Sequence, residues 1–126
     1  MNATNGFEVT VARSAHREVD EFCESQGITA IDVLKLDVQG AEDRVLSGAR
    51  QMLARRAIQV VFLELIVTPA YVGQADPGRI ITLLQEAGLG MVDIYDVSRK
   101  GLVLLQFDVL FAQRERLEAL KASQRK

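Results

Sequence analysis

The sequence predicts an α/β fold made of one domain that spans residues 1–126, with parallel strands, a C-terminal antiparallel hairpin and flanking helices. Short aliphatic runs alternate along the chain with amphipathic stretches, which is typical of α/β proteins. The run at 31–37 is so rich in aliphatic residues that we expect burial on both faces, as in a parallel sheet. Only residues 97–101 separate the last two apolar runs, at 91–96 and 102–111, and a crossover helix does not fit there. These two strands should therefore pair in an antiparallel hairpin.

The first half of the chain predicts a helix, a strand and a second helix. Residues 20–26 should form a short helix that ends at Gly27, before the strand at 31–37. Residues 41–55 place apolar side chains at helical spacing and predict one amphipathic helix. Gly48 lies inside this helix, where glycine costs up to about 1 kcal/mol relative to alanine. This glycine indicates close packing of the helix against a neighbour.

The second half begins with the most apolar strand, at 58–67, in which Glu64 is the one charged residue. Asp76 and Pro77 are typical of a helix start, because Asp76 can cap free amides and proline suits the first helical position. This helix should continue to about residue 87, and Gly88 is placed to end it in the left-handed conformation. After the hairpin, the residues from 113 onward predict a polar helix.

Composition excludes several classes of protein. Lys and Arg total 15 against 17 Asp and Glu, so the net charge of −2 gives no basic field for a nucleic acid. Cys23 is the only cysteine, which excludes an intrachain disulfide framework and a multi-cysteine zinc site and favours a cytoplasmic protein. No motif supports pairing Cys23 with His16 for catalysis. Neither a membrane-spanning run of about 18 apolar residues nor a signal peptide is evident, so we expect a soluble protein without membrane or metal partners.

The best candidate for a functional site follows the strand at 31–37. Ligands of parallel α/β sheets bind beyond the carboxyl ends of the strands, and Asp37 stands at such an end. Gly40 permits a sharp turn into the next helix, and Glu42 falls in its first turn. Two interpretations stay open, because Asp37 and Glu42 can contact a ligand or can simply cap the helix and complement its dipole. Glu64 near the end of the next strand should reach the same edge of the sheet.

Two further charges in apolar strands are ambiguous. Lys35 and Asp108 can each pair with an opposite charge or face a ligand. Three known binding motifs are excluded by spacing. An EF-hand loop has its glycine at the sixth position, whereas the glycine is fourth when counted from Asp37. Neither the Gly-x-Gly-x-x-Gly motif nor the Gly-x-x-x-x-Gly-Lys-Ser/Thr motif for binding phosphate occurs. A phospho-accepting receiver with Asp37 as acceptor is disfavoured, because the N-terminal segment has no paired acids to hold magnesium.

Several segments together resemble the later half of the S-adenosylmethionine-dependent methyltransferases of the FkbM type, over about residues 18–111. The most specific is Leu-Lys-Leu-Asp-Val-Gln-Gly-Ala-Glu at 34–42, followed by Val-Leu-Ser-Gly-Ala at 45–49. The others are Asp-Glu-Phe-Cys-Glu at 20–24, Gly-Ile at 27–28, Glu64, Pro-Ala-Tyr-Val-Gly-Gln at 69–74, the turn at Gly88 and Asp-Val-Leu-Phe at 108–111. Glu18 and Val19 depart from the Thr-Leu that the family often has there.

The resemblance implies a Rossmann-like methyltransferase half-fold, in which Asp37 ends the family's fourth strand and Glu64 lies on the fifth. It implies S-adenosylmethionine as the cofactor, with Asp37, Val38 and Gln39 as cofactor-binding residues and Asp37, Glu42 and Glu64 as catalytic residues. The acceptor would be a small molecule with a hydroxyl group, such as a sugar or another metabolite. The family's glycine-rich first strand and acidic second strand lie upstream of this sequence, so the chain corresponds to the C-terminal part of the domain. By itself it is not expected to hold the cofactor well.

An alternative of a different class is a catalytically silent α/β fragment or interaction module that pairs with another chain. In the family's strand order the fourth strand pairs with the first, so residues 31–37 should be left as a sheet edge that recruits another strand. We therefore expect either self-association at this edge or coverage of it by residues 7–11, which alternate with strand period.

Overall fold

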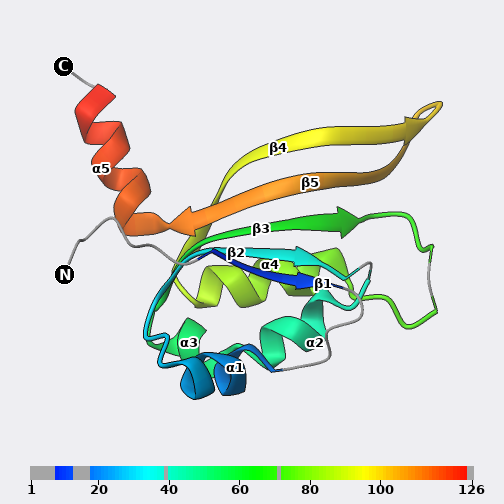
Figure 1. The fold of residues 1–126 in the computed structure, drawn as a ribbon. Coiled ribbons are helices and arrows are strands. Elements are labelled where there is room, and N and C mark those ends of the chain that lie inside the picture. Colours follow the sequence, from blue (N-terminus) through cyan, green and yellow to red (C-terminus); the bar gives the residue numbers. More distant parts are fainter. Residues whose placement is uncertain (1–7, 13–17, 39, 71, 125–126) are drawn as a thin grey trace.

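A computed structural model describes residues 8–12, 18–38, 40–70 and 72–124 of the chain. Within these residues the strands form one sheet in the order β1-β2-β3-β5-β4 (Figure 1). The elements in chain order are β1 (Glu8–Ala12), α1 (Val19–Gln26), β2 (Ile31–Asp37), α2 (Glu42–Ser47), α3 (Arg50–Ala54), β3 (Ile58–Ile66), α4 (Pro77–Glu86), β4 (Leu89–Lys100), β5 (Val103–Gln113) and α5 (Arg114–Gln124).

The sheet is parallel at one end and antiparallel at the other. β1, β2 and β3 run parallel, whereas β5 is antiparallel to both β3 and β4. The predicted antiparallel hairpin is therefore confirmed, with longer strands than expected. Residues 97–100, predicted as connection, belong to β4, and the turn lies at 101–102, where Gly101 has a φ of 60°. β4 accommodates its extra length through register shifts relative to β5.

The edge of β2 is covered by the chain's own N-terminal segment. β1 pairs in parallel along β2, with Glu8 opposite Val33 and Ala12 opposite Asp37. This pairing confirms the second of the two predicted outcomes for this edge, and Phe7 lies outside the described residues. β2 consequently has a hydrogen-bonded neighbour on each side.

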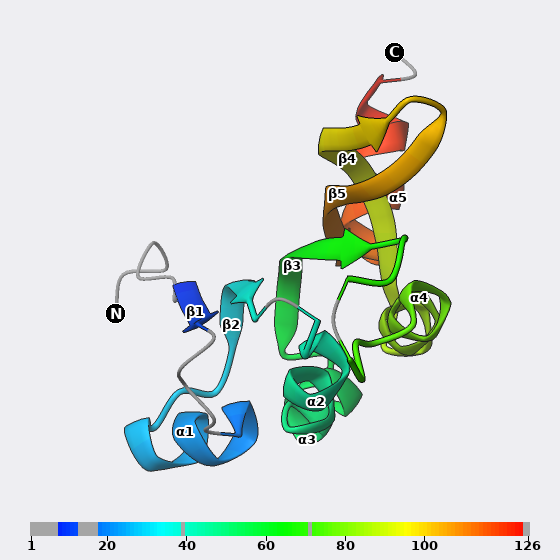
Figure 2. The same cartoon turned by 90° about the vertical axis from the view of Figure 1, so that its right-hand side faces the viewer.

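Helices α1, α2, α3 and α4 all lie on one side of the sheet, as Figures 1 and 2 show from two directions. The strand residues that face these helices belong to the core. From β2, β3 and β5 the core includes Leu34, Leu36, Val61, Leu63, Val109 and Phe111, each at most 3% exposed. On β2 the alternate residues Lys35 and Asp37 are exposed. The prediction that this strand is buried on both faces is therefore wrong, because the described helices cover only one face of β2.

The second face of the sheet is contacted by α5 near the start of β4. Leu117 of α5 lines a hollow together with Val60 of β3 and Leu110 of β5. The residues that follow them in these strands are part of the core under the helices, so Val60 and Leu110 face the other side of the sheet. A Cβ atom at Gly90 would lie 3.1 Å from the Leu117 side chain, so glycine permits this close approach. Along β4 and around the turn of the hairpin, several apolar side chains are exposed: Met91, Val92, Ile94, Tyr95, Val97, Leu102 and Val103.

The prediction of a single helix at 41–55 is wrong. Two short helices, α2 and α3, form there instead and are separated at Gly48. Contacts with α1 account for the break. The Gly48 carbonyl accepts a hydrogen bond of 2.8 Å from the Asp20 amide, and a Cβ at Gly48 would lie 3.2 Å from the Glu18 Cα. The expected close packing of Gly48 against a neighbour is confirmed.

The glycines predicted to end helices behave as expected, whereas the aspartate predicted to cap a helix start does not. α1 ends at Gly27 with a φ of 68°, and Gly88 after α4 has a φ of 85°, both left-handed as predicted. Asp76 stands at the N-cap position of α4 with extended backbone, but its side chain makes no capping hydrogen bond. That part of the prediction is wrong, and the exposed carboxylate faces solvent instead.

Candidate functional site

Asp37 and Glu64 lie on neighbouring strands at the carboxyl edge of the parallel part of the sheet. Lys35 lies opposite Phe62 in the pairing of β2 with β3. Asp37 and Glu64, each two residues further along its strand, therefore lie side by side. Asp37 is exposed at the last position of β2, whereas Glu64 is half-buried. The prediction that these two carboxylates share one edge is confirmed.

A third carboxylate joins them from β5. Asp108 stands directly opposite Glu64 in the β3–β5 pairing and opposite Tyr95 in the β4–β5 pairing. The Tyr95 ring lies 6.2 Å from that of Phe62, on the same face. Asp37, Glu64 and Asp108 therefore follow one another across three adjacent strands.

Burial and mutual repulsion act on Glu64. Loss of hydration raises the pKa of the Glu64 carboxyl above its ordinary value, and the negative charges of Asp108 and Asp37 raise it further. The Gln106 Nε2 donates a hydrogen bond of 3.1 Å to Glu64 Oε2. Glu64 is thus a carboxylate with a fixed orientation and an increased affinity for a proton.

Asp108 is held in a similar way. Its pKa is raised by burial first and then by a hydrogen bond with the Asp96 side chain and the negative charges of Asp96 and Asp37, while Lys35 opposes the shift. Asp96 has a φ of 49° at an irregular position of β4, within the register shift that follows Tyr95. The carboxylates of this face therefore compete for protons, with Lys35 on β2 as a nearby positive charge.

Glu42 occupies a different environment from Asp37 and Glu64. It is only 2% exposed, and both carboxylate oxygens accept a hydrogen bond from the Gly40 amide at 3.2 Å. Burial raises the pKa of Glu42, and the hydrogen bond from Gly40 opposes this shift. The Glu42 carboxylate thus binds the turn that follows β2. Val38 in the same turn is buried, and Gln39 lies outside the described residues.

Sequence reasoning did not identify Gln106 or Asp96 as neighbours of the site. Gln106 is one polar residue in an apolar strand and is 42 residues from Glu64, so only the strand register reveals their contact. Asp96 was assigned to the end of a strand, and nothing local indicates the left-handed backbone that it adopts. The chemical roles predicted for Asp37, Glu42, Glu64, Val38 and Gln39 stay predictions.

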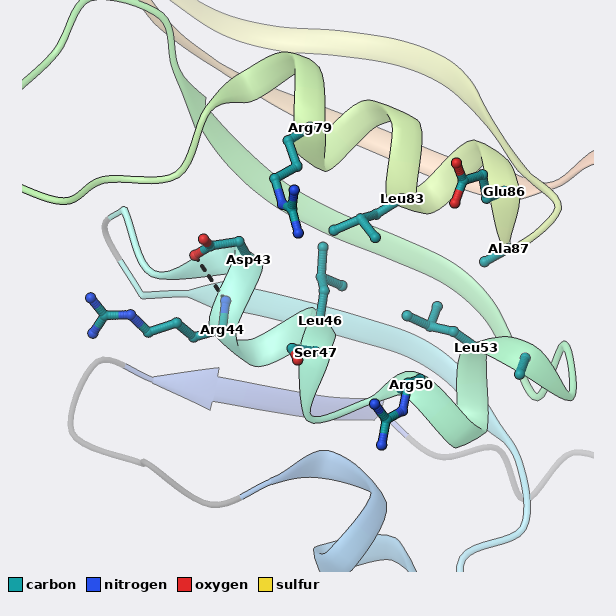
Figure 3. A pocket seen from close by; sticks show the side chains of 11 residues that line it. Asp43, Arg44, Leu46, Ser47, Arg50, Leu53, Arg79, Leu83, Glu86 and Ala87 are labelled. Atoms are coloured by element: carbon teal, nitrogen blue, oxygen red, sulfur yellow. Dashed lines mark hydrogen bonds between the residues drawn. The ribbon is translucent and has the colours of Figure 1, made fainter.

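A separate groove of about 610 Å³ opens in the helical layer, between α2 and α3 on one side and α4 on the other. In Figure 3, Leu46 of α2 and Leu83 of α4 point toward each other, and Arg79 extends from α4 toward Asp43. The Asp43 carboxylate accepts a hydrogen bond of 2.9 Å from the Arg44 amide. None of the predicted site residues that the structure describes lines this groove.

Within the described ranges, no group of three or more His, Cys, Asp and Glu side chains is arranged to hold a metal ion. Among the same residues, no helix is long and apolar enough to cross a membrane.

Comparison with known proteins shows the family to which the chain belongs. The sequence profile described as the methyltransferase FkbM domain matches residues 3–89, which is more than half of the chain. The chain therefore belongs to the FkbM methyltransferase family, as predicted from its sequence. The match begins before the predicted resemblance at residue 18 and ends at the start of β4, so it does not extend over the hairpin.

One curated relative illustrates the similarity. The 2-O-methyltransferase NoeI of Sinorhizobium fredii (strain NBRC 101917 / NGR234) is 32% identical over 68 residues, which cover 54% of this chain and 27% of the relative. The chain thus spans only about a quarter of the length of the curated relative that it matches. No solved structure matches the chain significantly.

Proposed function

We propose that this chain forms the acceptor side of an S-adenosylmethionine-dependent O-methyltransferase with a Rossmann-like sheet, acting on a hydroxyl group of a sugar or another small metabolite. Membership of the FkbM family and the similarity to a 2-O-methyltransferase support the reaction class. The observation that carries the location is the convergence of Asp37, Glu64 and Asp108 at one sheet edge. The single cysteine is consistent with a cytoplasmic enzyme.

The residues of the edge suit the charge of the cofactor. S-adenosylmethionine, when bound, supplies a methyl group on a positively charged sulfur. Asp37, Glu64, Asp96 and Asp108 give this face an excess of negative charge, which Lys35 offsets only in part. We assign the cofactor contact to Asp37 and to Val38 and Gln39, which follow it directly.

Methyl transfer to a hydroxyl requires an oriented oxygen atom and a group that takes its proton. Asp37 is exposed at the strand end and is the residue that we assign to orienting the acceptor. Glu64 carries the raised pKa that favours proton uptake, and Gln106 holds its carboxylate in place. The hydroxyl proton would pass to Glu64 as the new carbon–oxygen bond forms and the bond between the methyl group and the cofactor sulfur breaks. Glu42 is engaged with Gly40, so we assign proton transfer to Glu64 rather than to Glu42.

Binding and activity measurements test this proposal. Calorimetric titration with S-adenosylmethionine should be carried out on this chain and on any longer form of the protein that its gene encodes. In an active form, Asp37→Asn should lower methyl transfer about tenfold or more, because positioning at a reacting centre commonly contributes that much. Asp32→Asn, an exposed change at the other end of β2, is the control and should leave the rate unchanged. Unchanged turnover in Asp37→Asn would remove Asp37 from the site, and absence of cofactor binding in every form would refute the reaction class.

The second candidate function is that of an interaction module without catalytic activity, which pairs with another chain. The exposed apolar residues of the β4–β5 hairpin favour it, since contiguous apolar surface commonly marks a contact with another protein. Self-association of the isolated chain, measured by light scattering, together with absence of cofactor binding would support this candidate over the enzyme.

A further inference from the structure

We infer that Glu42 and Gln74 are positioning residues, which hold in place the loop after β2 and the loop after β3 respectively. The hydrogen bond from Ala75 to Gly40 joins these two loops, so that the loops beside Asp37 and Glu64 move as one unit. Only the expected effect of these residues on methyl transfer rests on the proposed function. Four residues form the connection, which we call the Gly40 bridge: Gly40, Glu42, Gln74 and Ala75.

The first half of the Gly40 bridge fixes the turn that follows Asp37. Gly40 has a φ of 99°, a conformation that other residues rarely adopt, and its amide points to both carboxylate oxygens of Glu42. An acid that merely complements a helix dipole remains in solvent at the first turn, whereas Glu42 is 2% exposed. Burying a carboxylate is costly, as the raised pKa of Glu42 reflects. The hydrogen bonds to Gly40 offset part of this cost.

The second half joins the same glycine to the loop after β3. The Gly40 carbonyl accepts a hydrogen bond of 2.9 Å from the Ala75 amide. The neighbouring Gln74 side chain accepts a hydrogen bond from the Ala70 amide at 2.7 Å and donates one to the Ile66 carbonyl at 3.2 Å. Gln74 therefore ties the loop back to the end of β3, two residues beyond Glu64.

Gly40 is thus held on both of its polar groups by different segments of the chain. Its amide is bound from α2, and its carbonyl is bound from the loop that precedes α4. A change at either end should be felt at the other, because releasing Gly40 frees both loops. Asp37 is three residues from Gly40 and Glu64 is two residues from Ile66, so both carboxylates depend on this connection.

Amide hydrogen exchange measured by NMR on this chain tests the inference without cofactor or activity. Glu42→Ala should increase exchange about tenfold at Gly40 and also at Ala75, since one hydrogen bond to a charged group contributes about that much. Gln74→Ala should increase exchange at the same two amides. Glu42→Gln retains an acceptor oxygen and should restore much of the protection at Gly40.

A control variant in the same helical turn and a core residue that reports folding complete the experiment. Asp43→Asn changes an acid in the same helical turn whose hydrogen bond goes to the Arg44 amide, so Gly40 and Ala75 should exchange as in the wild type. Protection of Phe111 in the core reports whether each variant is folded. If Glu42→Ala fails to fold, Gln74→Ala decides alone. Faster exchange confined to one of the two loops, or to neither, would overturn the inference.

An activity measurement separates this inference from the proposed function. In an active form of the protein, Glu42→Ala should lower kcat more than it changes KM, because the bridge orients reacting groups rather than binding the acceptor. Coupled exchange without methyl transfer in any form would refute the proposed function and leave the bridge intact. Methyl transfer without coupled exchange would refute the bridge alone.

Discussion

The contact between Asp20 and the start of α3 gives a prediction that can be worked out from the structure. The Asp20 carboxylate accepts hydrogen bonds from the Gln51 amide at 2.8 Å and from the Met52 amide at 2.9 Å. A residue of α1 therefore caps the N-terminus of a helix that lies 31 residues further along the chain. Asp20→Ala removes both acceptors and leaves the two amides without this partner.

The magnitude follows from the number and type of hydrogen bonds. Loss of one capping side chain costs about 0.5–2 kcal/mol, and hydrogen bonds to charged groups lie in the upper part of that range. We expect Asp20→Ala to lower the free energy of unfolding by about 2 kcal/mol. Unfolding entropies of about 2.1 cal/mol/K per residue, applied to the 126 residues of the chain, convert this loss to a decrease in Tm of about 8 °C.

Thermal and urea denaturation followed by circular dichroism measure this effect. Glu24→Ala is a matched control, because Glu24 is an exposed acid on the same helix, and its replacement should change stability by less than about 0.5 kcal/mol. Asp20→Asn keeps one acceptor oxygen and should lie between Asp20→Ala and the wild type. A Tm for Asp20→Ala equal to that of Glu24→Ala would refute the assignment of Asp20 as the cap of α3.

Two further predictions concern the charge of Asp108 and the pairing of β1 with the edge of β2. The pKa of Asp108 is raised in the folded state, so its contribution to stability is present below its unfolded pKa and is lost as the pH rises through the folded value. Asp108→Asn should therefore increase Tm at pH 7 and reduce the gain in stability that the wild type shows on acidification toward the ordinary carboxyl pKa of 3.8, as thermal scans from pH 7 down to this value would show. An unchanged pH profile would contradict the repulsion assigned to this carboxylate. Deletion of residues 1–12 removes β1 and exposes the edge of β2, so light scattering should show stronger self-association than in the complete chain, and a monomeric deletion variant would argue against protection by β1.

The sequence by itself determined the local features of this protein and the edge on which its candidate site lies. Period and composition identified the strand before Asp37 and the strand that contains Glu64. Because parallel strands present their carboxyl ends together, the proximity of these two residues followed without any knowledge of the register. Gly27 and Gly88 were equally predictable, since a left-handed helix end depends on the absence of a side chain at one position.

Tertiary structure decided the features that depend on contacts between distant segments. The break at Gly48 arises from the approach of α1. The glycine indicated close packing against a neighbour, but residues 41–55 do not show that this neighbour is α1 or that the helix breaks there. The contact of Gln106 with Glu64 requires the exact register of β5 against β3. Glu42 illustrates the general reason, because a helix-starting acid looks the same in the sequence whether it is exposed or buried. Its burial and its bond to Gly40 result from how the chain packs around the turn, and packing is a property of the whole fold rather than of any local segment.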